Sequence, residues 1–228
     1  MGLGLSTGGA SSDRTPYVKY DARAGRWFRV DRSQGAGGEW VTDSVDVTNG
    51  FSFVADMANI QVGWINYSDQ GPQKIMVKLG EPMPARPDGV NDKGKAAFRQ
   101  GFNLMMALPK NLGGGVREFN SNAGCVIEAM DDLHTAYSSA PEAAQGKLPV
   151  VASPSAVPVK SGQSTNYKPQ FQITGWVDRP AGLGAQAPTT AKPTATATPP
   201  STGSTQAPPP AARPAPQPAA AMDASDFG

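Results

Sequence analysis

The residues of this chain that could carry out chemistry are few, and they do not form a known catalytic set. His134 is the only histidine and Cys125 the only cysteine, which excludes a multi-histidine metal site, a thiolate cluster and an intrachain disulfide. Asp131 and Asp132 are adjacent, so on a helix they point about 100° apart and do not converge on one ion. Gly113-Gly114-Gly115 lacks the Gly-Lys-Ser/Thr ending of a phosphate loop, so a glycine turn is expected. We therefore expect no enzyme, no cofactor and no metal site, although a site built from carboxylates alone stays open.

Cations and aromatic rings, in contrast, occur together at several places. Single-stranded nucleic acid needs cations that follow its backbone and exposed rings on which its bases stack. The candidate nucleic-acid-binding residues are Arg26, Trp27, Arg29, Trp64, Tyr67, Lys74, Lys78, Lys93, Lys95, Arg99, Tyr167 and Lys168. The same rings could be packing anchors of a core, and the same cations an ordinary solvated surface. The residue types leave both interpretations open.

The net charge of +1 argues neither for nor against nucleic acid, so the distribution of charge matters more. One group of cations lies between Asp13 and Arg32, and it consists of Arg14, Lys19, Arg23, Arg26, Arg29 and Arg32. Asp13, Asp21 and Asp31 lie in the same segment and cancel part of its field. A second group follows at Arg86, Lys93, Lys95 and Arg99.

Short strand-like segments, separated by Gly, Pro, Asn and Asp, must position these residues. Strands are predicted at 40–42, 44–47, 51–54, 62–67, 74–79, 98–108, 116–119 and 171–177, with a long loop over 80–95. One helix is predicted over 123–137, with Ser121 or Asn122 as its N-cap and an apolar stripe at Val126, Met130, Leu133 and Tyr137. The prediction is a mainly β protein: an antiparallel barrel like the oligonucleotide-binding (OB) fold, with one inserted helix. A β-sandwich is the alternative.

The composition divides the chain into four parts. Residues 1–13 are predicted to be a flexible leader and 14–180 an OB-like, single-stranded-DNA-binding domain. Residues 181–221 are rich in Pro, Ala and Thr and bury too little apolar surface to fold, which predicts a disordered linker. Residues 222–228 form an acidic-aromatic tip. With no secretory signal and no apolar stretch of membrane-spanning length, we expect a cytoplasmic protein that does not enter a membrane.

The layout of body, linker and tip resembles phage single-stranded DNA-binding proteins. The resemblance rests on the β-rich body with its late helix, the closing segment Asn166–Trp176 and the tail Met222-Asp223-Ala224-Ser225-Asp226-Phe227-Gly228. It implies sequence-independent binding of single-stranded DNA in phage replication or recombination, in the host cytoplasm. In that family the tail recruits partner enzymes, a role that falls here on Asp223, Asp226 and Phe227. Family tails usually carry more carboxylates and often end on the aromatic residue, whereas Gly228 ends this one.

Two other functions stay open at this point. The chain could be a phage structural or assembly protein that binds no nucleic acid, with its tail as a spacer. It could also be an accessory module that binds an enzyme but no nucleic acid. The residues leave strand order, self-association into a homo-oligomer, the identity of the partners and the choice between DNA and RNA undecided.

Overall fold

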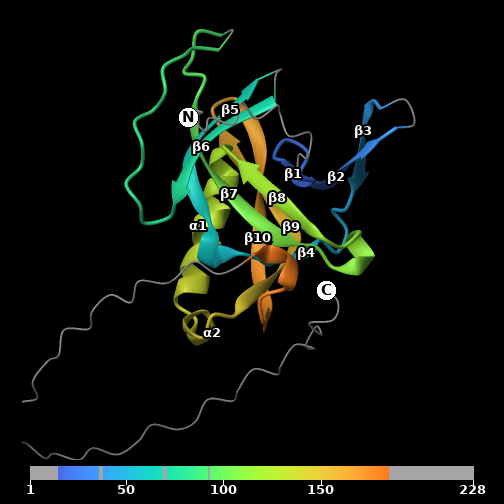
Figure 1. Ribbon diagram of the computed structural model, residues 1–228. Coiled ribbons are helices and arrows are strands. Elements are labelled where there is room, and N and C mark those ends of the chain that lie inside the picture. Colours follow the sequence, from blue (N-terminus) through green and yellow to red (C-terminus); the bar gives the residue numbers. More distant parts are fainter. Residues whose placement is uncertain (1–14, 36–37, 69–70, 92, 185–228) are drawn as a thin grey trace, which may run out of the picture.

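The structure, a computed structural model, describes residues 15–35, 38–68, 71–91 and 93–184. These residues form a mainly β protein with ten strands in one sheet that does not close, one long helix and one four-residue helix (Figure 1). The predicted fold class is confirmed, and the architecture is consistent with a β-barrel or a β-sandwich. The predicted leader, most of the predicted linker and the tip lie outside the described residues.

The elements follow one another along the chain in this order. The strands are β1 (Tyr17–Asp21), β2 (Arg26–Gln34), β3 (Trp40–Asp46), β4 (Ser52–Ala55), β5 (Gln61–Ser68), β6 (Gly71–Lys78), β7 (Arg99–Ala107), β8 (Val116–Ser121), β9 (Leu148–Ser161) and β10 (Ser164–Val177). The α-helices are α1 (Gly124–Ser138) and α2 (Pro141–Ala144), and the 3₁₀ turns are η1 (Met57–Asn59), η2 (Lys110–Leu112) and η3 (Ala181–Leu183).

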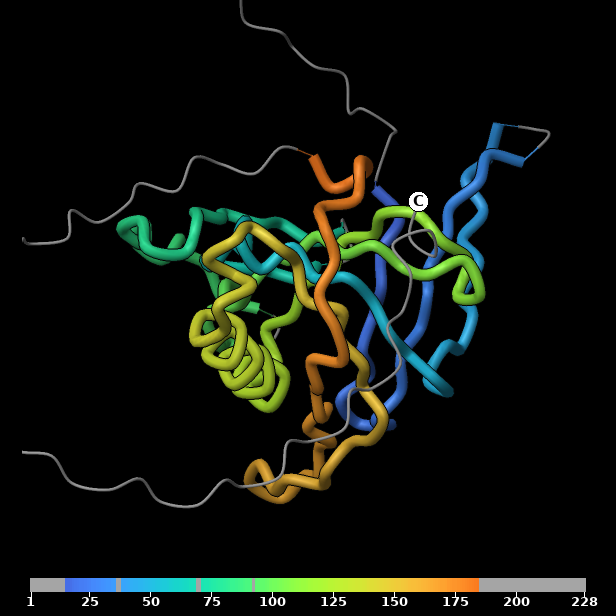
Figure 2. Tube along the Cα trace, turned by 90° about the horizontal axis from the view of Figure 1, so that it is seen from below, coloured from blue at the N-terminus to red at the C-terminus, as the bar shows by residue number. Residues whose placement is uncertain are grey.

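The sheet forks at strand β7. Residues 99–103 of β7 pair with β5, and Met106 and Ala107 pair with β4 on the same edge, while β8 occupies the opposite edge. One branch therefore continues through β5 to β6, and the other through β4 and β9 to β10. On the far side the order is β8-β1-β2-β3, with a parallel β1–β8 pair. The β2–β3 and β9–β10 hairpins extend from the body in different directions (Figure 2).

The alternation of side chains explains which face of the sheet is buried. One face of β7 is at most 3 % exposed, as the sequence pattern predicted, and it consists of Phe102, Leu104 and Met106. Trp27 lies at the centre of the aromatic cluster, stacked on Phe51 with ring centroids 4.3 Å apart. The other face of β1 and β8 is accessible, and several cations without an ion pair in the described residues lie around it.

Helix α1 covers one side of this core. Its apolar stripe of Val126, Met130, Leu133 and Tyr137 is buried, as predicted, and the helix packs against β10. The N-cap is Ala123 rather than Ser121 or Asn122, but the Ser121 hydroxyl accepts the Ala123 N–H at 3.2 Å just before the helix begins. The packed body extends past the predicted end at residue 180, because Leu183 of η3 is buried.

Strand β9 is a strand that the sequence pattern did not predict, because it contains three prolines. Pro149 lies near its start, and Pro154 and Pro158 lie beyond Ala152, the last β9 residue that pairs with β4. A proline lacks the N–H that a second partner strand would use, so it is tolerated where one edge is open. The outer half of the β9–β10 hairpin is such a place.

Candidate nucleic-acid interface

Trp27 does not belong to any exposed surface. Its ring is 1 % exposed, its Nε1 donates to the Ser153 hydroxyl at 3.1 Å, and its faces contact other rings of the core. The prediction that a base stacks on Trp27 is wrong, because the alternation of β2 turns this residue inward.

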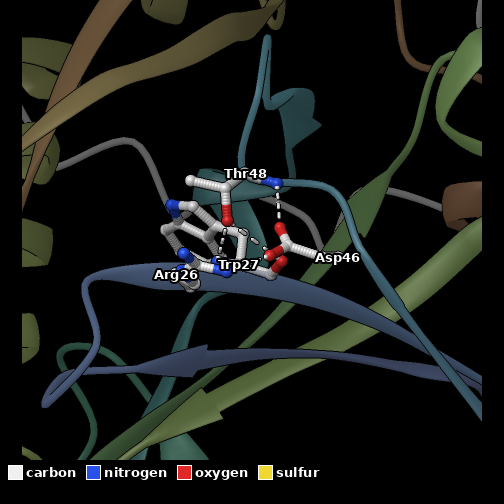
Figure 3. Close-up of polar contacts among 4 residues, drawn as sticks. All are labelled: Arg26, Trp27, Asp46 and Thr48. Carbon is white, nitrogen blue, oxygen red and sulfur yellow. Dashed lines mark hydrogen bonds and ion pairs between the residues drawn. The ribbon is translucent and has the colours of Figure 1, made fainter.

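The cations that flank Trp27 are already paired. Arg26 forms an ion pair with Asp46 at 3.1 Å, and the backbone N–H of Thr48 donates to the same carboxylate (Figure 3). These hydrogen bonds, led by those from Thr48, lower the pKa of Asp46, which stays ionised opposite Arg26. Arg29 pairs with Asp31 at 2.6 Å and donates to the Leu112 carbonyl. Arg26 thus joins the two strands at the base of the β2–β3 hairpin, and Arg29 joins β2 to the η2 turn.

The loop over residues 80–95 holds two of the predicted residues and covers a third, Trp64 of β5. Trp64 is half-buried beneath this loop, because its Nε1 donates to the Pro84 carbonyl at 2.9 Å and Arg86 lies over its ring. Lys93 and Lys95 are exposed on a turn, and both of their backbone N–H groups donate to the Asn91 side chain. The structure does not bring these lysines together with the aromatic candidates.

Tyr167 and Lys168 anchor β10 rather than presenting a free surface. The Tyr167 N–H donates to the Ala22 carbonyl at 2.6 Å, and the Tyr167 carbonyl accepts the Tyr20 hydroxyl. Lys168 forms an ion pair with Asp132 at 2.8 Å, and the hydrogen bond that Lys168 donates to this carboxylate raises the pKa of Lys168. Asp132 therefore serves as a salt-bridge partner on the exposed face of α1.

A cleft of about 1310 Å³ is lined by three of the four remaining candidates. It lies on the face of β1 and β8 opposite the core, and residues of β5, β6, β9, β10 and the start of α1 complete its walls. Tyr67, Lys74 and Arg99 were predicted and line it; Lys78, at the end of β6, does not. The cleft also has cations that were not among the candidates: Lys19, Arg23, Arg32 and Lys160.

The cleft carries an excess of positive charge. Six cations line it, against the carboxylates of Asp21, Glu118 and Glu128. Of the six, only Lys74 forms an ion pair within the described residues, with Glu118. The Nε of Arg32 is buried and has no hydrogen-bond partner in the described part of the chain.

Two tyrosine rings lie among these cations. Arg32 stacks over the ring of Tyr17, with 5.6 Å between the guanidinium carbon and the ring centroid. Tyr67 is 50 % exposed, and its hydroxyl donates to the Asn120 side-chain oxygen at 2.5 Å. Desolvation, with a contribution from Glu118, raises the pKa of Tyr67 to about 12, so its ring is neutral at physiological pH. Tyr20 also lines the cleft, but it is buried.

Helix α1 adds to the positive potential of the cleft. Ala123, Gly124 and Cys125 line the cleft at the helix start. This end has no side-chain cap hydrogen bond and no carboxylate in its first turn, so the partial positive charge of the helix terminus is not cancelled locally. Burial raises the pKa of the Cys125 thiol, which makes it a packed group rather than a nucleophile.

The sequence contained a partial signal for the residues that were missed. Lys19, Arg23 and Arg32 belong to the basic group that ends at Arg32, but the candidate set took Arg26 and Arg29 from that group instead. On β1, Val18 and Tyr20 are buried while Tyr17 and Lys19 lie on the opposite face. Recognising β1 as a strand would have separated the face that lines the cleft from the face that packs in the core.

The described residues contain no group of three or more His, Cys, Asp and Glu side chains that could hold a metal ion. None of the helices in the described ranges has the length and apolar character needed to cross a membrane. Comparison of the chain with protein-family models, curated proteins and solved structures finds no match. The resemblance to phage single-stranded DNA-binding proteins therefore stays a prediction from the residues.

Proposed function

We propose that this protein binds single-stranded DNA, without sequence preference, in the cleft on the outer face of β1 and β8. The observation that carries the proposal is the presence of unpaired cations and accessible tyrosine rings in one cleft. Unpaired cations in a cleft attract a polyanion more strongly than cations already compensated by carboxylates. No group in the cleft suggests a chemical reaction on the nucleic acid, so the proposed role is binding.

Within the cleft, phosphates and bases have separate partners. Five cations of the cleft have no ion pair among the described residues, so they are available for phosphates. They are Lys19, Arg23, Arg32, Arg99 and Lys160. The rings of Tyr17 and Tyr67 offer stacking surfaces, and stacking is tolerant of base identity because every base has a π-face. The combination accounts for affinity without sequence readout.

The biological setting of the proposal rests on the resemblance alone. We propose that the protein acts in phage DNA replication or recombination in the host cytoplasm, and that Asp223, Asp226 and Phe227 recruit partner enzymes. The tip lies outside the described residues, so its support is its composition: one aromatic ring with flanking carboxylates can dock on a basic, apolar pocket.

Titration of fluorescently labelled oligo-dT with the full chain, followed by anisotropy at low and high salt, tests the proposal. We expect saturable binding whose affinity falls steeply as salt increases, because each phosphate contact releases counterions. Absence of binding at low salt, or an affinity that does not change with salt, would contradict the proposal. A protein that ignores the oligonucleotide and forms a large assembly instead supports a structural role.

A further inference from the structure

Three of the described strands, β3, β6 and β10, pair with a neighbouring strand on one side only, and β3 and β6 lie at opposite ends of one continuous path. The order β6-β5-β7-β8-β1-β2-β3 follows neighbouring strands through the body, and each terminal strand has a partner on one side only. An open edge presents unpaired backbone groups on which a further strand can pair. Within the described residues, no second strand pairs with the outer edge of β3 or of β6.

The two edges carry opposite charge. Residues 39–46 include Glu39, Asp43 and Asp46 and no cation, whereas residues 71–79 include Lys74 and Lys78 and no carboxylate. Arg26 compensates Asp46 and Glu118 compensates Lys74. Glu39, Asp43 and Lys78 form no ion pair in the described part of the chain, so their charges are available to a partner.

Both edges also expose apolar side chains. Trp40 and Val41 at the start of β3 are 50 % and 46 % exposed, and residues 40–44 are exposed on both faces of the strand. Ile75 and Leu79, on and just after β6, are 42 % and 47 % exposed. A contact between the two edges would remove this apolar surface from water.

We propose that the β3 edge of one copy pairs with the β6 edge of another, which builds an open, head-to-tail array. Pairing of like edges is disfavoured, because two β3 edges would oppose carboxylates and two β6 edges would oppose lysines. A contact between different surfaces of identical copies does not close on itself unless the rotation happens to form a ring. The partner is therefore a second copy of this chain, and the product is a chain of copies.

The spacing of the charges specifies a register for this contact. Glu39 and Asp43 are four residues apart, as are Lys74 and Lys78. Antiparallel pairing with Glu39 opposite Lys78 joins two charges that form no ion pair in the described part of the chain, and it places Asp43 opposite Lys74, which already pairs with Glu118. The same register sets Trp40 opposite Val77.

The proposed array is compatible with the cleft but does not rest on nucleic-acid binding. Arg32, on the β2 strand that carries β3, and Lys74, on β6, both line the cleft. A neighbour seated on either edge therefore lies beside residues of the cleft. Head-to-tail copies along one strand would give cooperative binding, which is common for proteins of this type.

Sedimentation velocity of the full chain without DNA, over a wide concentration range at low salt, tests the array. The wild type is expected to sediment faster as concentration rises, without a limiting dimer. E39K places a lysine opposite Lys78, and K78E places a glutamate opposite Glu39. Each variant is therefore expected to require at least about tenfold higher concentration for the same association. Lys95→Glu, an equal charge change on an exposed loop, is expected to associate normally.

Mixing the two variants supplies the decisive control. In an equimolar mixture of E39K and K78E, each edge finds an oppositely charged edge on the other variant, so association should return to the wild-type range. A wild type that stays monomeric, a dimer that neither change affects, or a mixture that fails to associate would overturn the array. Oligo-dT binding, measured on the same samples, shows separately whether the cleft functions, because neither residue lines it.

Discussion

At the scale of single residues, the cleft depends on rings that are fixed but accessible. Tyr67 is fixed at its tip by Asn120, and Tyr17 is covered on one side by the Arg32 guanidinium. A ring that is already oriented loses little conformational freedom when a base stacks on it. The four tryptophans would attract attention first in a sequence, yet Trp27 is core and Trp64 lies under a loop.

Replacing Tyr67 tests whether its ring or its hydroxyl matters. Tyr67→Ala should weaken oligo-dT binding by about 1–3 kcal/mol, the usual value of one stacked base. Tyr67→Phe loses the hydrogen bond to Asn120 but keeps the ring, so it should retain most of the affinity. Anisotropy titrations of both variants measure the difference; equal losses would assign the effect to the hydroxyl instead of stacking.

The raised pKa of Tyr67 predicts how stability changes in alkaline solution. The folded-state pKa of about 12 exceeds the ordinary tyrosine pKa of 10.0, so the folded state favours the neutral phenol. The resulting stability is fully present below pH 10 and is lost as the pH rises toward 12. Urea unfolding between pH 9 and about 12 should show this decline, and Tyr67→Phe should reduce it. Burial also raises the pKa of Tyr20 and Tyr137, so part of the decline should persist in the variant.

At the scale of elements, one buried ion pair joins the end of β10 to the η1 turn. Both guanidinium nitrogens of Arg179 donate to Asp56, at 2.7 and 2.8 Å, and Asp56 is 2 % exposed. The hydrogen bonds that Arg179 donates to Asp56 raise the pKa of Arg179. Such a pair contributes little net stability by itself, but removal of one partner leaves an uncompensated buried charge.

Arg179→Met should therefore lower the free energy of unfolding by about 3–5 kcal/mol. The double variant Arg179→Met, Asp56→Leu should lose less, because it leaves neither charge buried alone. Chemical denaturation of both variants measures the comparison. A double variant less stable than Arg179→Met would contradict the view that the isolated carboxylate causes the loss.

The same elements show which parts of the fold could be predicted from sequence. Helix α1 and strand β7 follow from local periodicity, because their buried faces repeat at the helical and strand spacings. Strands β1 and β2 were not predicted, because cations and aspartates interrupt their apolar pattern. Those charges lie partly on the face that forms the cleft, so the residues that hid the strands are the residues that build the candidate site.

At the scale of the whole molecule, the cleft arises from pairings that local sequence does not reveal. Strand β1 lies beside β8, about one hundred residues later, in a parallel register that sets Tyr17 opposite Glu118. Tyr67 reaches Asn120 across a separation of 53 residues. Long-range pairing of this kind depends on the total packing of the sheet, so the sequence could indicate basic and aromatic ingredients but not which of them meet.

The most direct test of the central claim compares cations inside and outside the cleft. Arg32 and Arg99 line the cleft, whereas Lys93 and Lys95 do not, so R32Q/R99Q and K93Q/K95Q change the net charge equally. Oligo-dT affinity of each full-length variant is measured against salt concentration. The account predicts that R32Q/R99Q reduces the slope of log affinity against log salt by about 1.4, at about 0.7 per lost phosphate contact, while K93Q/K95Q leaves it unchanged. Equal slopes for the two variants would contradict the claim that the cleft holds the nucleic acid.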